Sequence, residues 1–344
     1  MIPIQNVYYM LSYAFQVLNE QGYKDIATEK FNNTAELMAA ILAKGIAVQI
    51  KRGLGKEYIP QTESLSALRG KIDMAESIKT QSMLRKQMIC TYDEFSVNGT
   101  MNRIIKSTVE LLLRSDISKI RKKELRKLMV YFGDVEPIDL YTINWNIQYN
   151  RNNQTYRLLV SICYLVVKGL LQTNSDGSTR LMEFVDEQRM CRLYEKFILE
   201  YYRKEYPNIT ANASQIAWQL DDSIGAMLPV MQTDIMLTYK EKVLIIDAKY
   251  YTHTTQSKFD RHTLHSGNLY QIFTYVKNKE IELATQPHEV SGILLYAKTD
   301  ETIYPNNTYQ MSGNKISVKT LDLNLAFDGI AAQLNGIVKE YFGL

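Results

Sequence analysis

The first half of the chain shows helical and β-like patterns of apolar residues in turn. Apolar side chains recur every three or four positions over residues 5–18 and 34–51, with Thr34 as a suitable N-cap, which predicts two amphipathic helices. Residues 53–92 form short β-like pieces broken by glycine and proline, which predicts a small β-rich module. Helical patterns return over residues 101–114, 117–131 and 156–171.

The second half predicts a β-sheet flanked by helices. A helical pattern over residues 187–204 precedes two apolar β runs, 229–239 and 242–249, which are separated by a Lys-Glu turn. This order predicts an α/β core with a mixed sheet, in a chain that is α+β overall. A helix over 267–278, a strand over 290–296 and a last amphipathic helix over 325–341 complete the pattern.

A polar, linker-like stretch at residues 173–178 separates the two halves. The length of 344 residues suits two domains. We therefore expect a helical and β-rich N-terminal domain over residues 1–178 and an α/β domain over residues 179–344.

Composition and charge narrow the class of protein. With 46% hydrophobic and 22% charged residues the chain is expected to fold rather than remain disordered. A net charge of +3 means that any nucleic-acid surface must be local. The helix over 117–131 carries a basic run, which is either a solvated face or a contact for nucleic acid or a partner. Its cations are Lys119, Arg121, Lys122, Lys123, Arg126 and Lys127.

Cysteine usage and hydropathy point to the cytoplasm. Cys90, Cys163 and Cys191 lie far apart and have apolar neighbours, which predicts buried free thiols in a reducing compartment. The N-terminus lacks the basic and apolar regions of a signal peptide. The longest apolar stretch, residues 158–171, is too short to span a bilayer and predicts a buried helix, so no membrane association is expected.

Candidate chemistry gathers at the two β runs of the second half. Asp234 lies within the first run and Asp247 near the end of the second, so a hairpin would bring both carboxylates to one place. Burying them is costly unless a cation compensates. Mg²⁺ would suit two carboxylates, the carbonyl of Ala248, water and a phosphate oxygen. Asp247 and Lys249 are two apart, so both face the same side of the strand.

A lone D-x-K at a strand end is usually structural, but further residues join this one. Glu195 lies on the preceding helix. Gln271 and Tyr275 form a Q-x-x-x-Y pattern on one face of the following helix.

This order of residues resembles the PD-(D/E)XK nuclease superfamily, in the branch with the trailing Q-x-x-x-Y motif. More narrowly, the chain resembles the McrC family of nuclease subunits from modification-dependent restriction systems, over essentially its whole length. One departure is Thr233, which replaces the proline that often precedes the first aspartate. The supporting stretches are residues 4–14, 68–72, 102–106, 247–251 and 268–271.

The resemblance implies a DNA endonuclease with a PD-(D/E)XK core in the C-terminal domain. Asp234 and Asp247 would bind Mg²⁺, with Mn²⁺ as a substitute, and Lys249 would assist the attacking water. Glu195 would complete the site directly or through water. The residues of the Q-x-x-x-Y pattern would support the site or contact the DNA backbone.

The resemblance also implies a partner. The chain contains no G-x-x-x-x-G-K-[ST] motif, so it cannot supply its own P-loop motor. McrC-like proteins work with an McrB-like AAA+ GTPase ring that recognises methylated DNA. Residues 1 to about 180 would dock onto the ring and stimulate its GTPase, with the β-rich module at 53–92 as the candidate contact.

Three other functions are compatible with parts of the sequence. A stand-alone repair or recombination nuclease would need no large docking region. A silent regulator of the ring would not need the full set of site residues, and a metabolic enzyme would need a cofactor loop.

The segment that follows the D-x-K strand is expected to be a polar loop near DNA rather than a zinc site. It contains His253, His262 and His265, with Lys258 and Arg261 as candidate phosphate contacts.

Overall fold

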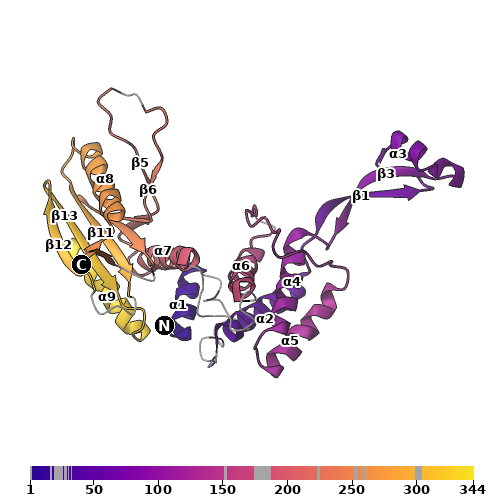
Figure 1. Cartoon of the computed structure of the whole chain (residues 1–344), viewed down its shortest axis with the longest axis horizontal. Coiled ribbons are helices and arrows are strands. Elements are labelled where there is room, and N and C mark those ends of the chain that lie inside the picture. The colour runs from indigo at the N-terminus through magenta and orange to yellow at the C-terminus, as the bar shows by residue number, and fades with distance from the viewer. Residues whose placement is uncertain are drawn as a thin grey trace. The chain divides into compact units, whose positions relative to one another are not determined.

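The computed structural model describes residues 2–15, 18, 26, 29, 31, 33–150, 153–173, 187–222, 225–251, 255–258, 261–298 and 304–344. Contacts divide the chain into two units, which are Met1–Ala27 with Phe184–Leu344, and Thr28–Glu183 (Figure 1). Within the described part of the chain, no helix is both long and apolar enough to cross a bilayer.

A six-stranded mixed sheet forms the centre of the first unit. Its order is β12-β13-β11-β8-β7-β4; β8, β11 and β13 are parallel and the other neighbours are antiparallel. The central strands β8 and β11 are buried almost throughout, as their apolar sequences require. The predicted mixed α/β fold is confirmed. The strands are β4 (Thr210–Asn212), β7 (Ile235–Tyr239), β8 (Lys242–Lys249), β11 (Glu289–Ala297), β12 (Asn307–Met311) and β13 (Asn314–Leu321).

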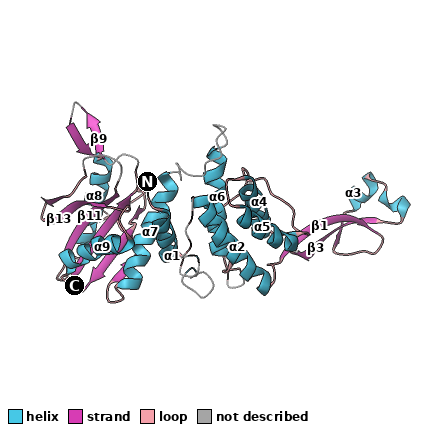
Figure 2. Ribbon diagram, turned by 90° about the horizontal axis from the view of Figure 1, so that it is seen from below, coloured by secondary structure: helices cyan, strands magenta, loops and turns pink. Residues whose placement is uncertain are grey.

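Helices cover both faces of this sheet (Figure 2). On one face α8 packs so closely that a Cβ atom on Gly292 of β11 would lie 2.8 Å from a Val276 atom and 2.9 Å from an Ile272 atom, so only glycine fits there. Leu295, on the other face of β11, lines a cavity together with Ile337 of α9. The helices of this unit are α1 (Ile4–Ala14), α7 (Glu187–Glu205), α8 (Ser266–Glu282) and α9 (Phe327–Phe342).

The N-terminal helix belongs to this unit and not to the expected domain 1–178. α1 packs against α7, and the buried Asn6 side chain donates hydrogen bonds to Leu323 O (2.7 Å) and Leu325 O (2.8 Å). The expected grouping was wrong for α1 because periodicity predicts a helix without saying which core it covers.

Smaller β elements flank the sheet. The segment expected as a polar loop contains a hairpin of β9 (Thr255–Lys258) and β10 (Arg261–Leu264). His253 lies outside the described residues, as do the side chains of Lys258, Arg261 and His262. A second pair, β5 (Gln215–Ile216) with β6 (Met231–Gln232), lies just before β7 in the chain.

The second unit combines helices with a three-stranded antiparallel sheet, here called the ribbon. β1 and β3 pair along their full length and β2 adds to β3. Asn33, not Thr34, is the N-cap of α2, since its side chain accepts from Glu36 N at 2.8 Å. The elements are α2 (Thr34–Arg52), β1 (Glu57–Leu65), β2 (Lys71–Ile72), α3 (Met74–Lys79), η3 (Ser82–Arg85), β3 (Met88–Ser96), α4 (Thr100–Arg114), α5 (Lys119–Met129), η4 (Val130–Phe132) and α6 (Tyr156–Thr173).

A hydrogen-bond network joins the base of the ribbon to the helices. Tyr156 Oη of α6 accepts from Gly55 N and donates to Asn102 Oδ1 of α4, both at 2.7 Å. Asn102 Nδ2 in turn donates to Gly55 O (2.8 Å) and Val97 O (2.7 Å). The two chain segments at the base of the ribbon, just before β1 and just after β3, are therefore attached to one buried pair of side chains.

Candidate active site

The β7–β8 hairpin brings the two predicted metal-binding aspartates together. Ile235 pairs with Ile246, so the next pair along the ladder places Asp234 opposite Asp247. Asp234 Oδ2 also accepts a hydrogen bond from Ala248 N at 2.9 Å. Directly opposed residues on antiparallel strands are close neighbours, so the two carboxylates share one small volume.

Asp234 lies in a β-bulge. Two residues separate Asn212 from Gln215, whereas three separate their partners, Gln232 and Met236. The strand that carries Asp234 therefore has one extra residue at this point. Bulges of this kind redirect a side chain and are common next to active sites.

Thr233 holds the bulge in place. It is buried, and its backbone N–H donates to Ser214 O at 2.9 Å. Its hydroxyl donates to the same carbonyl at 3.0 Å and accepts from Ser214 N at 3.1 Å. Proline, the usual residue at this position in the superfamily that the sequence resembles, could make neither the backbone bond nor the hydroxyl bonds.

Asp247 and Lys249 face the same side of β8, as their spacing predicts. Lys249 Nζ lies 2.8 Å from Asp247 Oδ2, and the Asp247 side chain is 2% exposed. This ion pair is close, but the buried oxygen accepts no hydrogen bond of regular geometry from the described residues. A buried carboxylate oxygen with an unsatisfied lone pair is suited to a second cation.

Burial dominates the electrostatics of the site. It raises the pKa of Asp234 and raises the pKa of Asp247 to about 7, against the opposing effect of the Lys249 ammonium. Burial alone would lower the pKa of Lys249, but the Asp247 and Asp234 carboxylates outweigh it and raise that pKa above its ordinary value. Lys249 is therefore a cation at neutral pH. Any further positive charge would stabilise the ionised form of the two aspartates.

The Q-x-x-x-Y pattern connects Lys249 to the start of the bulge. Gln271 Oε1 of α8 accepts from Lys249 Nζ at 3.4 Å, and Gln271 Nε2 donates to Tyr275 Oη at 2.8 Å. Tyr275 Oη donates onward to Gln232 O at 3.1 Å. The two residues thus hold the lysine and the Asp234 strand in a fixed relation.

Glu195 reaches the site from α7. Its Oε1 accepts from the Cys191 thiol at 3.0 Å, and that thiol also contacts Ala248 O at 3.9 Å. Burial raises the pKa of Glu195, and the nearby Asp234 carboxylate adds to the effect. Glu195 therefore belongs to the same electrostatic cluster as the aspartates.

The residues fit a magnesium site of the kind that uses few protein ligands. Among the described residues, no three His, Cys, Asp or Glu side chains are arranged to hold a metal ion by themselves. Mg²⁺ commonly takes one or two carboxylates and completes its octahedron with water and phosphate. Asp234, Asp247 and the Ala248 carbonyl suit that role, whereas Glu195 suits a role through water because Cys191 already occupies one of its oxygens.

Some residues of the site were not predicted from the sequence. Cys90 and Cys163 are buried free thiols as expected, but Cys191 is only half-buried and donates to Glu195. Its i, i+4 spacing from Glu195 is the signal that could have identified it. Asn268, one helical turn before Gln271, donates to the buried Tyr296 Oη at 2.9 Å.

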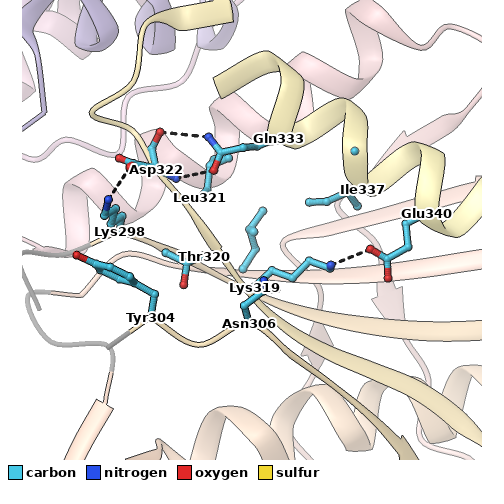
Figure 3. Close-up of a pocket in the computed structure, with 12 residues that line it drawn as sticks. Lys298, Tyr304, Asn306, Lys319, Thr320, Leu321, Asp322, Gln333, Ile337 and Glu340 are labelled. Atoms are coloured by element: carbon cyan, nitrogen blue, oxygen red, sulfur yellow. Dashed lines mark hydrogen bonds and ion pairs between the residues drawn. The ribbon is translucent and has the colours of Figure 1, made fainter. Parts of the chain in front are cut away.

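A cavity of about 470 Å³ between α9 and the ends of β11 and β13 is separate from this cluster (Figure 3). Lys298 pairs with Asp322 at 2.6 Å and Lys319 with Glu340 at 2.7 Å. The charged groups that line this cavity neutralise one another, and none of the predicted site residues lies in its wall.

Comparison with known proteins agrees with the resemblance. The chain is 28% identical to "Type IV methyl-directed restriction enzyme EcoKMcrBC" of Escherichia coli (strain K12), over 99% of this chain and 98% of the relative. A solved half-complex of Thermococcus gammatolerans McrB AAA+ hexamers with bound McrC matches 97% of this chain and 76% of that chain, at 20% identity and a TM-score of 0.48. A cryo-EM structure of the McrBC complex from the same organism matches 59% of this chain and 58% of that chain, at 24% identity and a TM-score of 0.41.

A family model described as "McrBC 5-methylcytosine restriction system component" matches residues 5–297, which include every predicted site residue. The chain therefore belongs to the family of McrBC 5-methylcytosine restriction system components.

Proposed function

We propose that this chain is the Mg²⁺-dependent DNA endonuclease subunit of a modification-dependent restriction complex. The observation that carries the proposal is the pair of opposed carboxylates, the half-buried Asp234 and the buried Asp247, with the Lys249 ammonium on the same face. A buried cluster of this kind is costly to maintain, which favours a functional role over a structural one.

Each residue has a role that its position supports. Asp234, Asp247 and the Ala248 carbonyl would hold Mg²⁺ (or Mn²⁺), which when bound lowers the pKa of a water and polarises the phosphate. Lys249 orients the attacking water and offsets charge on the phosphate. Glu195 accepts a hydrogen bond from water at the edge of the site.

The Q-x-x-x-Y pair supports these groups from α8. Gln271 keeps the lysine aimed at the phosphate, and Tyr275 keeps the Asp234 strand in register with it. Their tethering lowers the reorganisation that the reaction requires.

We further propose that the second unit docks onto an AAA+ GTPase ring and stimulates it. The ribbon ends in exposed apolar side chains, which are unusual on a free surface and suit a protein partner. At its base, the ribbon is attached through Gly55 and Val97 to Asn102 and Tyr156. These bonds would transmit a displacement of the ribbon to the helices. The exposed residues at this end are Leu68, Met74, Ile78, Met83 and Leu84.

Cleavage of 5-methylcytosine-containing plasmid tests the nuclease proposal. Wild type, Asp247→Ala and the control Asp328→Asn, an exposed carboxylate on α9, are compared in Mg²⁺, with and without the AAA+ partner and GTP. We expect cleavage that needs the partner, is lost by at least about a thousandfold in Asp247→Ala, and is unchanged in the control.

Other outcomes select other functions. Cleavage without partner or GTP would indicate a stand-alone nuclease. GTPase stimulation without cleavage in any condition would indicate a regulator and reject the nuclease proposal.

A further inference from the structure

Positive charge is concentrated in the second unit. Residues 28–183 contain 23 Lys and Arg and 16 Asp and Glu, a net charge of +7, whereas the whole chain is +3 and the first unit is therefore −4. α5 alone carries six of these cations and one carboxylate, Glu124. The unit that holds the candidate active site thus has no excess of positive charge with which to retain a polyanion.

One cation of α5 is structural. Arg121 contacts Glu29 at 2.9 Å, Glu36 at 3.7 Å and Glu124 at 2.6 Å, and its side chain is only 16% exposed. Leu125 is fully buried and anchors the same side of the helix. These contacts fix α5 against α2 and determine which face remains outside.

The outward face of α5, here called the basic face, consists of Lys119, Lys123, Arg126 and Lys127. All four are exposed, and among the described residues none of them forms an ion pair. Their i, i+4, i+7 and i+8 spacing aligns them over about 12 Å of helix. The one carboxylate of α5 is already paired with Arg121, so the face is uniformly positive.

We infer that the basic face binds the sugar-phosphate backbone of DNA. This inference rests on the proposed function, which makes DNA the substrate. The backbone presents phosphates at spacings that a 12 Å row of cations can follow, and the charges complement each other without any base contact. The exposed Ile120, Val130 and Tyr131 beside the face leave a protein partner as the alternative that the experiment must separate.

Fluorescence anisotropy with a labelled, unmethylated 20-base-pair duplex in EDTA tests the inference, using the full chain over a range of salt concentrations. Lys123→Gln with Lys127→Gln should make the slope of log affinity against log salt shallower by about 1.8, because each lost phosphate contact removes about 0.9. The matched control is Lys51→Gln with Arg52→Gln, two exposed cations at the end of α2. It should keep the wild-type slope.

Equal losses in both variants, or no loss in the α5 variant, would overturn the inference. An α5 variant that binds DNA normally but no longer co-elutes with the AAA+ partner would assign the face to that protein instead. Asp247→Ala should still bind the duplex. If wild type does not bind DNA alone but cleaves it with its partner, the inference fails while the proposed function stands.

Discussion

At the scale of single residues, Thr233 shows how a departure from a motif can be accommodated. Its backbone and hydroxyl make three hydrogen bonds with Ser214, and these hold the bulge that turns Asp234 toward Asp247. The proline of the superfamily that the sequence resembles would restrain this point through its rigid ring. Here the same restraint comes from hydrogen bonds, so the replacement leaves the carboxylate pair intact.

Replacing Thr233 by valine should loosen the bulge with little change in volume. The half-buried Ser214 N–H loses its acceptor and the Ser214 carbonyl loses one of its two donors, which we expect to lower the free energy of unfolding by about 1–3 kcal/mol. The Mg²⁺ concentration for half-maximal cleavage should rise. Thr233→Ser keeps the hydroxyl and should restore that concentration toward wild type; a serine variant as impaired as valine would show that the hydroxyl does not position Asp234.

At the scale of elements, α8 connects two strands of the candidate site through its side chains. One helical turn places Gln271 and Tyr275 on the same face, so a single helix contacts both Lys249 on β8 and Gln232 on β6. The close approach at Gly292 keeps the helix at that distance from the sheet. The contacts that the Q-x-x-x-Y residues make with both strands therefore depend on helix–sheet packing.

Tyr275→Phe should lower kcat without unfolding the protein. It removes the hydroxyl that joins Gln271 to Gln232 O, and we expect about a tenfold loss, equivalent to about 1.4 kcal/mol. Single-turnover cleavage in saturating Mg²⁺ measures the effect. Tyr270→Phe is the matched control on the same helix, because its side chain is 68% exposed; similar losses in both variants would exclude a specific role for the Tyr275 hydroxyl.

At the scale of the whole molecule, the chain leaves one unit and returns to it. α1 is completed only by residues more than 300 positions later, since Asn6 bonds to Leu323 and Leu325. The second unit is thus an insertion between α1 and α7. An insertion of this kind lets the basic second unit differ in charge from the acidic unit that holds the candidate site.

Asn6→Ala should therefore destabilise the first unit, although it lies in the N-terminal helix. The buried Leu323 carbonyl and the part-buried Leu325 carbonyl both lose the Asn6 amide as donor, at a cost of about 1–3 kcal/mol. Hydrogen exchange should show faster opening of α1, α7 and α9 with unchanged protection of α2 and α4. Asn208→Ala, an exposed position before β4, is the control; faster exchange in α2 instead would contradict the division into units.

Local patterns in the sequence were sufficient to predict many of the helices and strands. The period of the apolar residues predicts α2 and α7, because each buries one face, and continuous apolar runs predict β8 and β11, which are buried on both faces. Alternation along a strand places Asp247 and Lys249 on one side, and helical spacing does the same for Gln271 and Tyr275. The main residues of the candidate site could therefore be predicted from the sequence.

Only the tertiary structure decided how these pieces meet. The bulge at Asp234 arises from a one-residue difference between two strand ladders, and the contact of Cys191 with Glu195 and Ala248 arises from how α7 lies on β8. Long-range packing likewise determined that α1 packs against α7 and which face of α5 is exposed. Periodicity records that a side chain is buried, but pairing register and helix docking depend on contacts between residues far apart in the chain, which no local pattern contains.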